Sequence, residues 1–389
     1  MLLQRITILF IFLNISTVFA QEDYQFSADI LAQIDKDTVS WKYQTGATAL
    51  SFSGYYKEVL KIWDKNGVRK QKITADDSLY FASSKKINAK DYIIKQSKNA
   101  QVIIINEAHH VASHRTFTTS LLKELYKNGY RYLGLEALQD VSVNQQKYAV
   151  TETGYYTKEP EFGNLVYEAL KIGYTLFHYE AAEGKNNKER EIEQAQNIQN
   201  FMKIVPNGKF IIHCGYAHAY ENDYPAWGKA MAGRLKESMN IDPFTIDQTQ
   251  FLERFDTANN HLFTNLNTTG APIVLIDKNG VVFNGKTDPK QTDVVVIHPP
   301  TKYINNRADW FIKGKTKYSV PASKSNNNKP LLVLAYRNAE FENKGTPADV
   351  IEITNNHAAK DLYLAKGKYT IVIKDKNYQI IDQYQVKIK

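Results

Sequence analysis

The sequence predicts an α/β protein with a mainly parallel central sheet, flanking helices, an N-terminal helical segment and a small C-terminal antiparallel β domain. Three observations lead to this class. Short apolar runs alternate with stretches of helical period between residues 99 and 322, which is typical of a parallel sheet with right-handed crossovers. Helical patterns precede this region and short strand patterns follow it. Polar side chains begin abruptly where several of the apolar runs end.

The first residues of the chain have the pattern of a secretory signal peptide, which we assign to residues 1–20. Arg5 precedes an apolar run over residues 6–13, and a small-residue end at Ala20 precedes Gln21. The run is far shorter than the roughly twenty residues that a membrane-spanning helix needs. We therefore expect a soluble protein without a transmembrane segment, secreted or periplasmic, and cleaved near Ala20 and Gln21.

Three regions follow the signal peptide. Residues 21–98 are expected to form the N-terminal helical segment, with helices over 30–34 and 42–64 that pack on the main domain. Residues 99–322 are expected to form the α/β domain. Residues 323–389 are expected to form the β-rich C-terminal domain, beginning with an asparagine-rich linker at 323–329.

The elements of the α/β domain can be placed in order. Strands are expected over 102–106, 130–135 and 174–179 and again from 210 onward. Helices over 115–128, 161–172 and 187–205 join them, and each ends before a glycine or a proline. A hairpin over 273–283 and a last strand over 293–297 complete the domain. The C-terminal domain is expected to contain strands over 331–336, 350–353, 368–374 and 379–388.

Glutamate and histidine side chains gather at the predicted strand ends. In open α/β sheets, ligands bind outside the carboxyl ends of the strands. Because parallel strands end at the same edge of a sheet, residues that are far apart in the sequence can meet there. The residues concerned are Glu107, His109 and His110 after the first strand, Glu136 after the second, Glu180 after the third and His218 after the fourth.

These residue types support two kinds of chemistry. Neutral imidazole and carboxylate bind zinc or manganese, and His109, Glu136 and His218 would be the ligands if a metal is bound. Alternatively, a histidine oriented by a glutamate can itself remove a proton from water. Glu107 and His109 would share a face of an extended chain, whereas Glu107 and His110 would share a face of a helical turn. The sequence therefore leaves the active histidine open.

Two further residues bear on this site. Arg190 lies near the start of a predicted helix, with Gln194 and Asn197 on the same face. From there Arg190 could reach the strand edge and stabilise a developing oxyanion. Cys214 is the only cysteine, which excludes an intramolecular disulfide. We interpret it as a small buried side chain and not as a nucleophile, because it lies within an apolar strand.

Composition and motifs disfavour several classes of protein. The net charge of +8 falls to +7 when Arg5 is removed with the signal peptide, and the lysines are scattered instead of forming a block. This is typical of a solvated basic surface, so we expect no nucleic-acid partner. The chain has no Gly-x-Ser-x-Gly elbow, phosphate loop or dinucleotide fingerprint, which disfavours a serine hydrolase, a P-loop nucleotidase and a Rossmann dehydrogenase.

Four short motifs lie between residues 101 and 250: Asn106-Glu107-Ala108-His109, the glutamate Glu136 after Gly129 and Tyr130, Arg190-Glu191 with Gln194-Ala195, and Gly215-Tyr216-Ala217-His218. Together they resemble the superfamily that joins erythromycin esterases, ChaN-type haem-binding proteins and the TraB/Tiki proteins. The resemblance implies an EreA/ChaN-like fold with Glu107, His109 or His110, Glu136 and His218 as site residues, and Arg190 beside them. Asn106 departs from the pattern, since these families usually have glycine there. The scaffold serves esters, peptides and haem, so the resemblance implies a site without fixing the substrate.

We consider three functions. The first is an exported hydrolase of an ester or amide, with a small-molecule or peptide substrate and with or without a divalent metal. The second is a haem-binding or haem-uptake protein of the ChaN type, with histidine and tyrosine as candidate axial ligands. The third is a catalytically inactive scaffold, suggested by Asn106, that recognises a partner through its C-terminal β domain.

Overall fold

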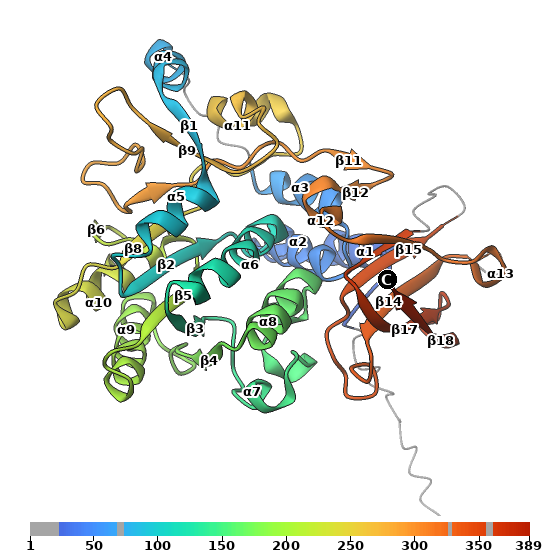
Figure 1. The fold of residues 1–389 in the computed structure, drawn as a ribbon. Coiled ribbons are helices and arrows are strands. Elements are labelled where there is room, and N and C mark those ends of the chain that lie inside the picture. The colour runs from blue at the N-terminus through green and yellow to red at the C-terminus, as the bar shows by residue number, and fades with distance from the viewer. Residues whose placement is uncertain (1–22, 68–73, 326–328, 355–360) are drawn as a thin grey trace, which may run out of the picture.

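The computed structural model describes residues 23–67, 74–325, 329–354 and 361–389 (Figure 1). The predicted signal peptide, residues 1–20, lies outside these ranges. Within them, no helix combines the length and the apolar character needed to cross a membrane.

The core of the molecule is a six-stranded sheet in the order β10-β8-β2-β5-β3-β4, and every neighbouring pair in it is parallel. This confirms the predicted fold class. β8 was not predicted, because its alternation of apolar and polar residues spans only four positions, and β10 lies within the last strand expected over 293–297. The strands are β2 (Val102–Glu107), β3 (Tyr130–Leu135), β4 (Thr175–His178), β5 (Lys209–Gly215), β8 (Phe244–Asp247) and β10 (Val294–Val295).

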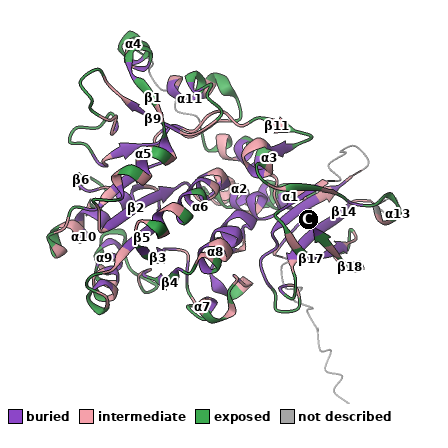
Figure 2. Ribbon diagram, in the orientation of Figure 1, coloured by how far each residue is buried: buried purple, intermediate pink, exposed green. Residues whose placement is uncertain are grey.

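Helices cover both faces of the sheet, and Figure 2 shows the sheet itself as buried. On one face, α6 (Ala112–Lys127) and α8 (Pro160–Ile172) pack on Ile103 and Ile105. On the other face, α9 (Asn187–Ile204) and α10 (Met231–Met239) pack on Val102 and Ile104. Alternate residues of β2 therefore enter opposite cores, as the period of an extended strand requires. The three predicted crossover helices are confirmed to within a few residues.

The N-terminal segment departs from the prediction in two ways. The expected helix over 42–64 is two helices, because Gly54 between them has φ of 78°, a left-handed conformation that side-chain-bearing residues rarely adopt. In addition, Phe26 and Phe52 pack with Leu334 of the C-terminal sheet, so the segment does not pack on the main domain alone. Figure 1 shows α1 and α2 beside that sheet. The helices are α1 (Ser27–Lys36), α2 (Lys42–Phe52), α3 (Tyr56–Trp63) and α4 (Ala75–Ser83).

The C-terminal region forms the predicted antiparallel sheet, in the order β15-β14-β17-β18. A second pair, β13 (Thr316–Ser319) with β16 (Asp361–Leu364), was not predicted. The helix α13 (Ala322–Ser325) covers the start of the expected linker. The strands of the main C-terminal sheet are β14 (Leu331–Arg337), β15 (Asp349–Ile353), β17 (Gly367–Lys374) and β18 (Ile380–Ile388).

The remaining elements are short. The predicted hairpin over 273–283 is present, since the Phe283 amide donates to the Leu275 carbonyl over 2.8 Å. Its strand β9 also pairs with β1, which was not predicted. These elements are β1 (Lys85–Asn88), α5 (Ala89–Gln96), α7 (Val143–Gln146), β6 (Asp223–Tyr224), β7 (Gly228–Lys229), α11 (Leu262–Leu266), β9 (Ile273–Ile276), β11 (Tyr303–Ile304), β12 (Arg307–Ala308) and α12 (Asp309–Ile312).

Candidate functional site

The carboxyl ends of β2, β3 and β5 bring most of the predicted site residues together. Glu107 is the last residue of β2, and Glu136 directly follows β3. His218 lies in the short helix η4 (Tyr216–Ala219) after β5, and Arg190 reaches the same edge from the first turns of α9. The contacts described below join these residues and His109 into one continuous cluster.

His109 and Glu107 form an oriented pair. Nδ1 of His109 lies 3.0 Å from Oε1 of Glu107. Burial would raise the pKa of Glu107, but the positive charge of Arg115 and the nearby His213 outweigh it and hold this pKa well below its usual range. Glu107 is therefore ionised and accepts a hydrogen from Nδ1, so that whenever the ring carries a single hydrogen, Nε2 is the acceptor. The ring stacks on Tyr156, with 4.1 Å between ring centroids.

Glu107 is held by the fully buried Arg115 of α6. Nε and Nη2 of Arg115 each donate to a Glu107 oxygen over 2.7 Å, and Nη2 also donates to the His109 carbonyl over 2.8 Å. Nη1 donates to Glu159 over 3.0 Å, and the Tyr56 hydroxyl donates to the other Glu159 oxygen over 2.9 Å. A buried chain of hydrogen bonds thus runs from α3 to the pair of Glu107 and His109.

Gly215 is required by the close approach of the His109 ring. A Cβ atom at this position would lie 2.4 Å from Cε1 and 2.5 Å from Nε2 of His109, far inside van der Waals contact. A glycine before a short helix commonly permits a tight turn. The φ of Gly215 is −89°, however, which any residue can adopt, and the left-handed conformation falls on Tyr216 at φ 41°. The glycine therefore provides space for the ring and not backbone freedom.

Glu136 lies at the centre of the cluster. Its Oε2 accepts the Gly215 amide hydrogen over 2.5 Å, and its Oε1 accepts from Nη2 of Arg190 over 2.5 Å. Burial opposes ionisation, but His218, His109 and Arg190 together lower the pKa of Glu136 to about 2. Arg190 also donates to both oxygens of Glu180. Glu136 is therefore a fixed negative charge between cationic and histidine groups.

His218 forms a second pair of histidine and carboxylate. Its Nδ1 lies 2.6 Å from Oε1 of Glu191, and its Nε2 lies 3.4 Å from Oε1 of Glu136 and 3.2 Å from Nη1 of Arg190. Burial would lower the pKa of His218, but Glu136 and Glu191 outweigh it and raise this pKa. His218 consequently favours the charged form at the site, and its ring also stacks on Trp227.

His110 faces away from this cluster. Its ring stacks on Trp63 with 3.5 Å between centroids, and its Nδ1 lies 3.3 Å from the Tyr216 hydroxyl. Burial lowers its pKa well below the usual range. Of the two histidines that the sequence left open, His109 is thus the one that the fold places beside Glu107 and Glu136.

Asn106 forms hydrogen bonds to neighbouring segments, and Cys214 is part of the apolar core. Nδ2 of Asn106 donates to the Tyr216 carbonyl and to Asp247, each over 2.8 Å, and its Oδ1 accepts the Gln248 amide hydrogen over 2.7 Å. Asn106 therefore ties the end of β2 to the segments after β5 and β8, which a glycine could not do. Cys214 is buried in the core, and burial raises its pKa well above the usual range, which agrees with the prediction of an inert thiol.

The predicted metal set of His109, Glu136 and His218 is not arranged as a metal site. Among the described residues, no group of three or more His, Cys, Asp or Glu side chains could hold a metal ion. The physical reason is Arg190, whose guanidinium contacts both Glu136 and His218 where a cation shared by these two residues would lie. Arg190 supplies the positive charge in its place.

The sequence pattern missed several supporting residues. His109 is held in place by Arg115, Glu159 and Tyr156, and His218 is oriented by Glu191. Of these four residues, only Glu191 belongs to one of the sequence motifs, the pair Arg190-Glu191. The side chains of Arg190, Gln194 and Asn197, which share one face of α9, all donate hydrogen bonds to the carboxylate or the carbonyl of Glu180. An unusual charge on the buried face of a helix is the signal that could have identified Arg115.

The comparisons with known proteins show partial structural similarity only. No family model and no curated protein matches the chain. The type III effector HopBA1 is similar with a TM-score of 0.31 and 10% identity, over 42% of this chain and 84% of that chain. RRSP, a MARTX toxin effector domain from Vibrio vulnificus CMCP6, is similar with a TM-score of 0.31 and 18% identity, over 59% and 48% of the two chains.

A third similar structure is ChaN of Campylobacter jejuni, solved with cofacial heme binding. The TM-score is 0.33 and the identity 11%, over 56% of this chain and 94% of that chain. The present chain thus spans nearly all of ChaN but about half of the toxin effector domain. Similarities at this level do not define a family for the chain, so its function has to be inferred from its own site.

Proposed function

We propose that this protein hydrolyses an ester or amide, with His109 as the general base and Arg190 with His218 as the groups that stabilise the oxyanion. The observation that carries the proposal is the pair of Glu107 and His109, in which the 3.0 Å contact fixes Nδ1 as the donor and leaves Nε2 open. The side chain of His109 is 19% exposed, so part of the ring meets solvent. An oriented histidine beside a fixed cation is the minimal set for acyl transfer to water.

Each residue then has a definite part in the reaction. Nε2 of His109 removes a proton from water, and the ionised Glu107 and Glu136 stabilise the imidazolium that forms. The water oxygen attacks the carbonyl carbon, and the negative charge that develops on the carbonyl oxygen is stabilised by Arg190 and charged His218. His109 then returns the proton to the leaving group. General-base catalysis of this kind contributes roughly 10²–10⁴-fold in rate, and one oxyanion donor contributes about 10²–10³-fold.

The test is hydrolysis of p-nitrophenyl acetate, p-nitrophenyl octanoate and alanine p-nitroanilide by the mature protein and by His109→Ala. The matched control is His178→Ala, because His178 is an exposed histidine on β4. We expect His109→Ala to lose roughly 10²-fold or more in kcat, with an unchanged circular dichroism spectrum, and His178→Ala to retain full activity. Equal turnover by the two variants, or no turnover of any substrate by the unmodified protein, contradicts the proposal.

Haem binding is the second candidate, because the same open nitrogen suits an axial iron ligand. The ring of His109 lies between Tyr156 and Tyr216, with centroid distances of 4.1 and 5.2 Å, so aromatic surface and a second potential ligand adjoin it. Haem titration followed by absorption separates the two candidates. A Soret band that His109→Ala abolishes supports haem binding, and a flat titration refutes it.

We also infer that the protein is exported. The signal-peptide pattern of residues 1–20 supports this inference. Sequencing of the mature N-terminus is expected to find Gln21 first, and a mature protein that retains Arg5 contradicts it.

A further inference from the structure

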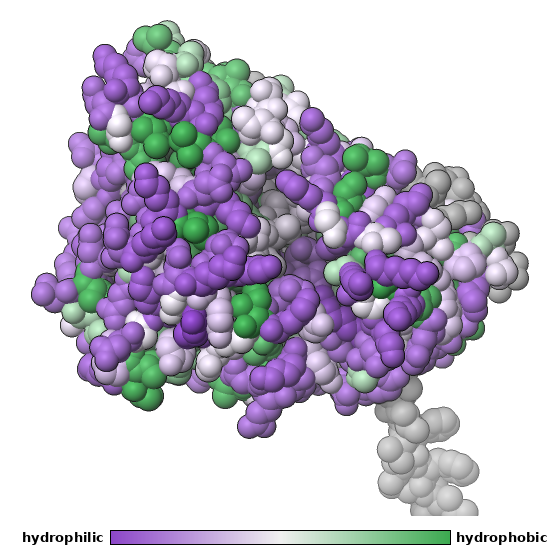
Figure 3. All heavy atoms as spheres, viewed as in Figure 1, coloured by the Kyte–Doolittle hydropathy of each residue, from purple (hydrophilic) through white to green (hydrophobic). Residues whose placement is uncertain are grey.

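A pocket lies on the flank of α6 and contains no residue of the Glu/His cluster. Its volume is about 340 Å³, within the range of small-molecule sites. Figure 3 shows a mostly hydrophilic face with a hollow near its centre, in the region where Figure 1 places α6 and α12. Phe117, Phe251, Pro299 and Trp310 contribute apolar walls. None of the lining residues belongs to the Glu/His cluster, so this is a separate site.

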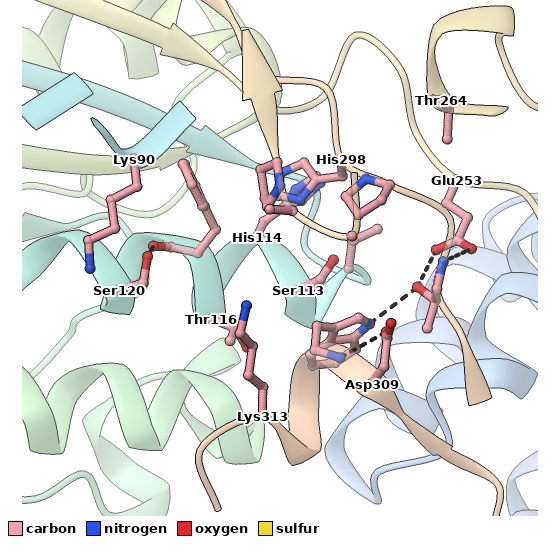
Figure 4. A pocket seen from close by; sticks show the side chains of 18 of the residues that line it. Lys90, Ser113, His114, Thr116, Ser120, Glu253, Thr264, His298, Asp309 and Lys313 are labelled. Atoms are coloured by element: carbon pink, nitrogen blue, oxygen red, sulfur yellow. Dashed lines mark hydrogen bonds between the residues drawn. The ribbon is translucent and has the colours of Figure 1, made fainter. Parts of the chain in front are cut away.

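The pocket carries two lysine side chains on one side. Lys90 of α5 and Lys313, which follows α12, line one end, and Figure 4 shows them on the opposite side from Glu253. Neither lysine has an ion-pair partner among the residues that the structure describes. Thr116 and Ser120 of α6 add hydroxyl groups near the lysines, and Ser113 lies nearer the middle of the pocket (Figure 4). Two unpaired ammonium groups beside a mostly apolar cavity favour an anion with an apolar body.

The opposite end of the pocket is not available to an anion. Both oxygens of Glu253 are already bonded, one to the Thr301 amide over 2.7 Å and the other to the Thr301 hydroxyl over 2.5 Å. The indole nitrogen of Trp310 donates to the same hydroxyl over 3.2 Å. Burial raises the pKa of Glu253 to about 7, and both of its oxygens are occupied by Thr301. This end therefore offers a ligand anion no free cation or donor, whereas Lys90 and Lys313 lie on the other side.

A buried histidine supplies a hydrogen-bond donor in the middle of the pocket. The Ala108 amide donates to Nδ1 of His114 over 3.1 Å, so the neutral ring carries its hydrogen on Nε2. Burial lowers the pKa of His114 well below its usual range and keeps the ring neutral. A ligand oxygen can therefore accept a hydrogen bond from His114 between the two ends of the cavity.

From these observations we infer a second ligand site that binds a small apolar carboxylate, with its carboxylate at Lys90 and Lys313 and its hydrocarbon body against Phe117, Phe251 and Trp310. The inference does not depend on the proposed hydrolase or haem function, because it uses none of the residues of that site. It requires only that the pocket distinguishes a negative head group from a neutral or positive one.

The test is isothermal titration of the mature protein with octanoate, octanol and octylamine, which share one hydrocarbon chain and differ in the charge of the head group. The site is altered by the double variant Lys90→Glu and Lys313→Glu. The matched control is Lys123→Glu. Lys123 is an exposed lysine on α6, the helix beside the pocket, and does not line the pocket. Quenching of tryptophan fluorescence by octanoate brominated at the chain end, repeated with Trp310→Phe, locates the bound chain.

We expect one octanoate per chain, with octanol and octylamine bound at least roughly tenfold more weakly, a difference of about 1.4 kcal/mol. The double variant is expected to lose octanoate binding, Lys123→Glu to retain it, and quenching to fall in Trp310→Phe. Absence of octanoate binding, equal affinity for the three ligands, unchanged affinity in the double variant or unchanged quenching in Trp310→Phe would each overturn the inference.

Discussion

Replacing Arg115 with methionine should show how much of the free energy of unfolding depends on a single buried cation. Arg115 is fully buried, and Glu107 and Glu159 are 1% and 0% exposed. The substitution keeps most of the side-chain volume but removes the guanidinium, so both carboxylates lose their partner in a medium that solvates charge poorly. Removing one member of a buried ion pair typically costs about 3–5 kcal/mol. With two carboxylates affected, we expect a loss of about 4–5 kcal/mol in the free energy of unfolding at about pH 7.

The pH dependence of this loss gives a second signature. In the wild type the pKa of Glu107 is held far below its reference of 4.5, so its stabilising contribution is present above that reference and is lost as pH falls through the folded pKa. Without Arg115, burial dominates and the folded pKa of Glu107 exceeds the reference. The cost of Arg115→Met should then shrink as pH is lowered from about 7 to about 5, because the buried carboxylates become protonated.

Urea unfolding followed by circular dichroism at both pH values measures this cost. Lys123→Met is the control, because it makes the same chemical change on the exposed face of α6, and it should alter the free energy of unfolding by less than about 0.5 kcal/mol. A cost for Arg115→Met below about 1 kcal/mol would refute the assignment of a buried network. A cost that grows as pH falls would refute the electrostatic reasoning.

Three further predictions concern the same cluster. Gly215→Ala should displace the His109 ring and lower hydrolytic activity by roughly tenfold or more with little change in Tm; full activity would show that the ring position is not needed. Glu136→Gln should lower the pKa of His218, because the Glu136 carboxylate is the main group that raises this pKa against burial. Charged His218 stabilises the fold below about pH 6.5, and this stabilisation is lost as pH rises through the folded pKa, so the variant should lose part of it. NMR titration of His218 measures the shift, and an unchanged titration contradicts the prediction. Tyr56→Phe should cost about 1–3 kcal/mol in unfolding free energy by removing a buried hydrogen bond to Glu159, and a change near zero would show that α3 is not coupled to the site.

The elements that the sequence predicted well are those in which local pattern and tertiary environment agree. β2 starts with a continuous apolar run because both of its faces are buried, whereas β3 includes the exposed Arg131. The polar ends of both strands follow from the parallel topology. β8 was missed because its alternation of apolar and polar residues spans only four positions. The break at Gly54 also has a tertiary context, since a Cβ there would lie 2.8 Å from the Val350 carbonyl.

The site itself was predicted in part for the same reason. Residues that end strands could be identified, because topology places them at one edge. Arg115, Glu159 and Glu191 could not, because helix periodicity does not say which polar residue turns inward to meet a carboxylate from another strand. The choice between His109 and His110 likewise depended on the path of the chain after β2, which only the three-dimensional packing determines.

The chain of hydrogen bonds from Tyr56 through Glu159 and Arg115 to Glu107 also ties the Glu/His cluster to the N-terminal helices. Tyr56 begins α3, whose neighbour α2 ends at Phe52 against the C-terminal sheet. The hydrogen bonds that orient His109 are therefore complete only when the N-terminal helices have packed against the central domain and the C-terminal sheet. A partly folded chain, or one trimmed to its central sheet, would therefore carry the Glu107 and His109 side chains without the hydrogen bonds that orient them.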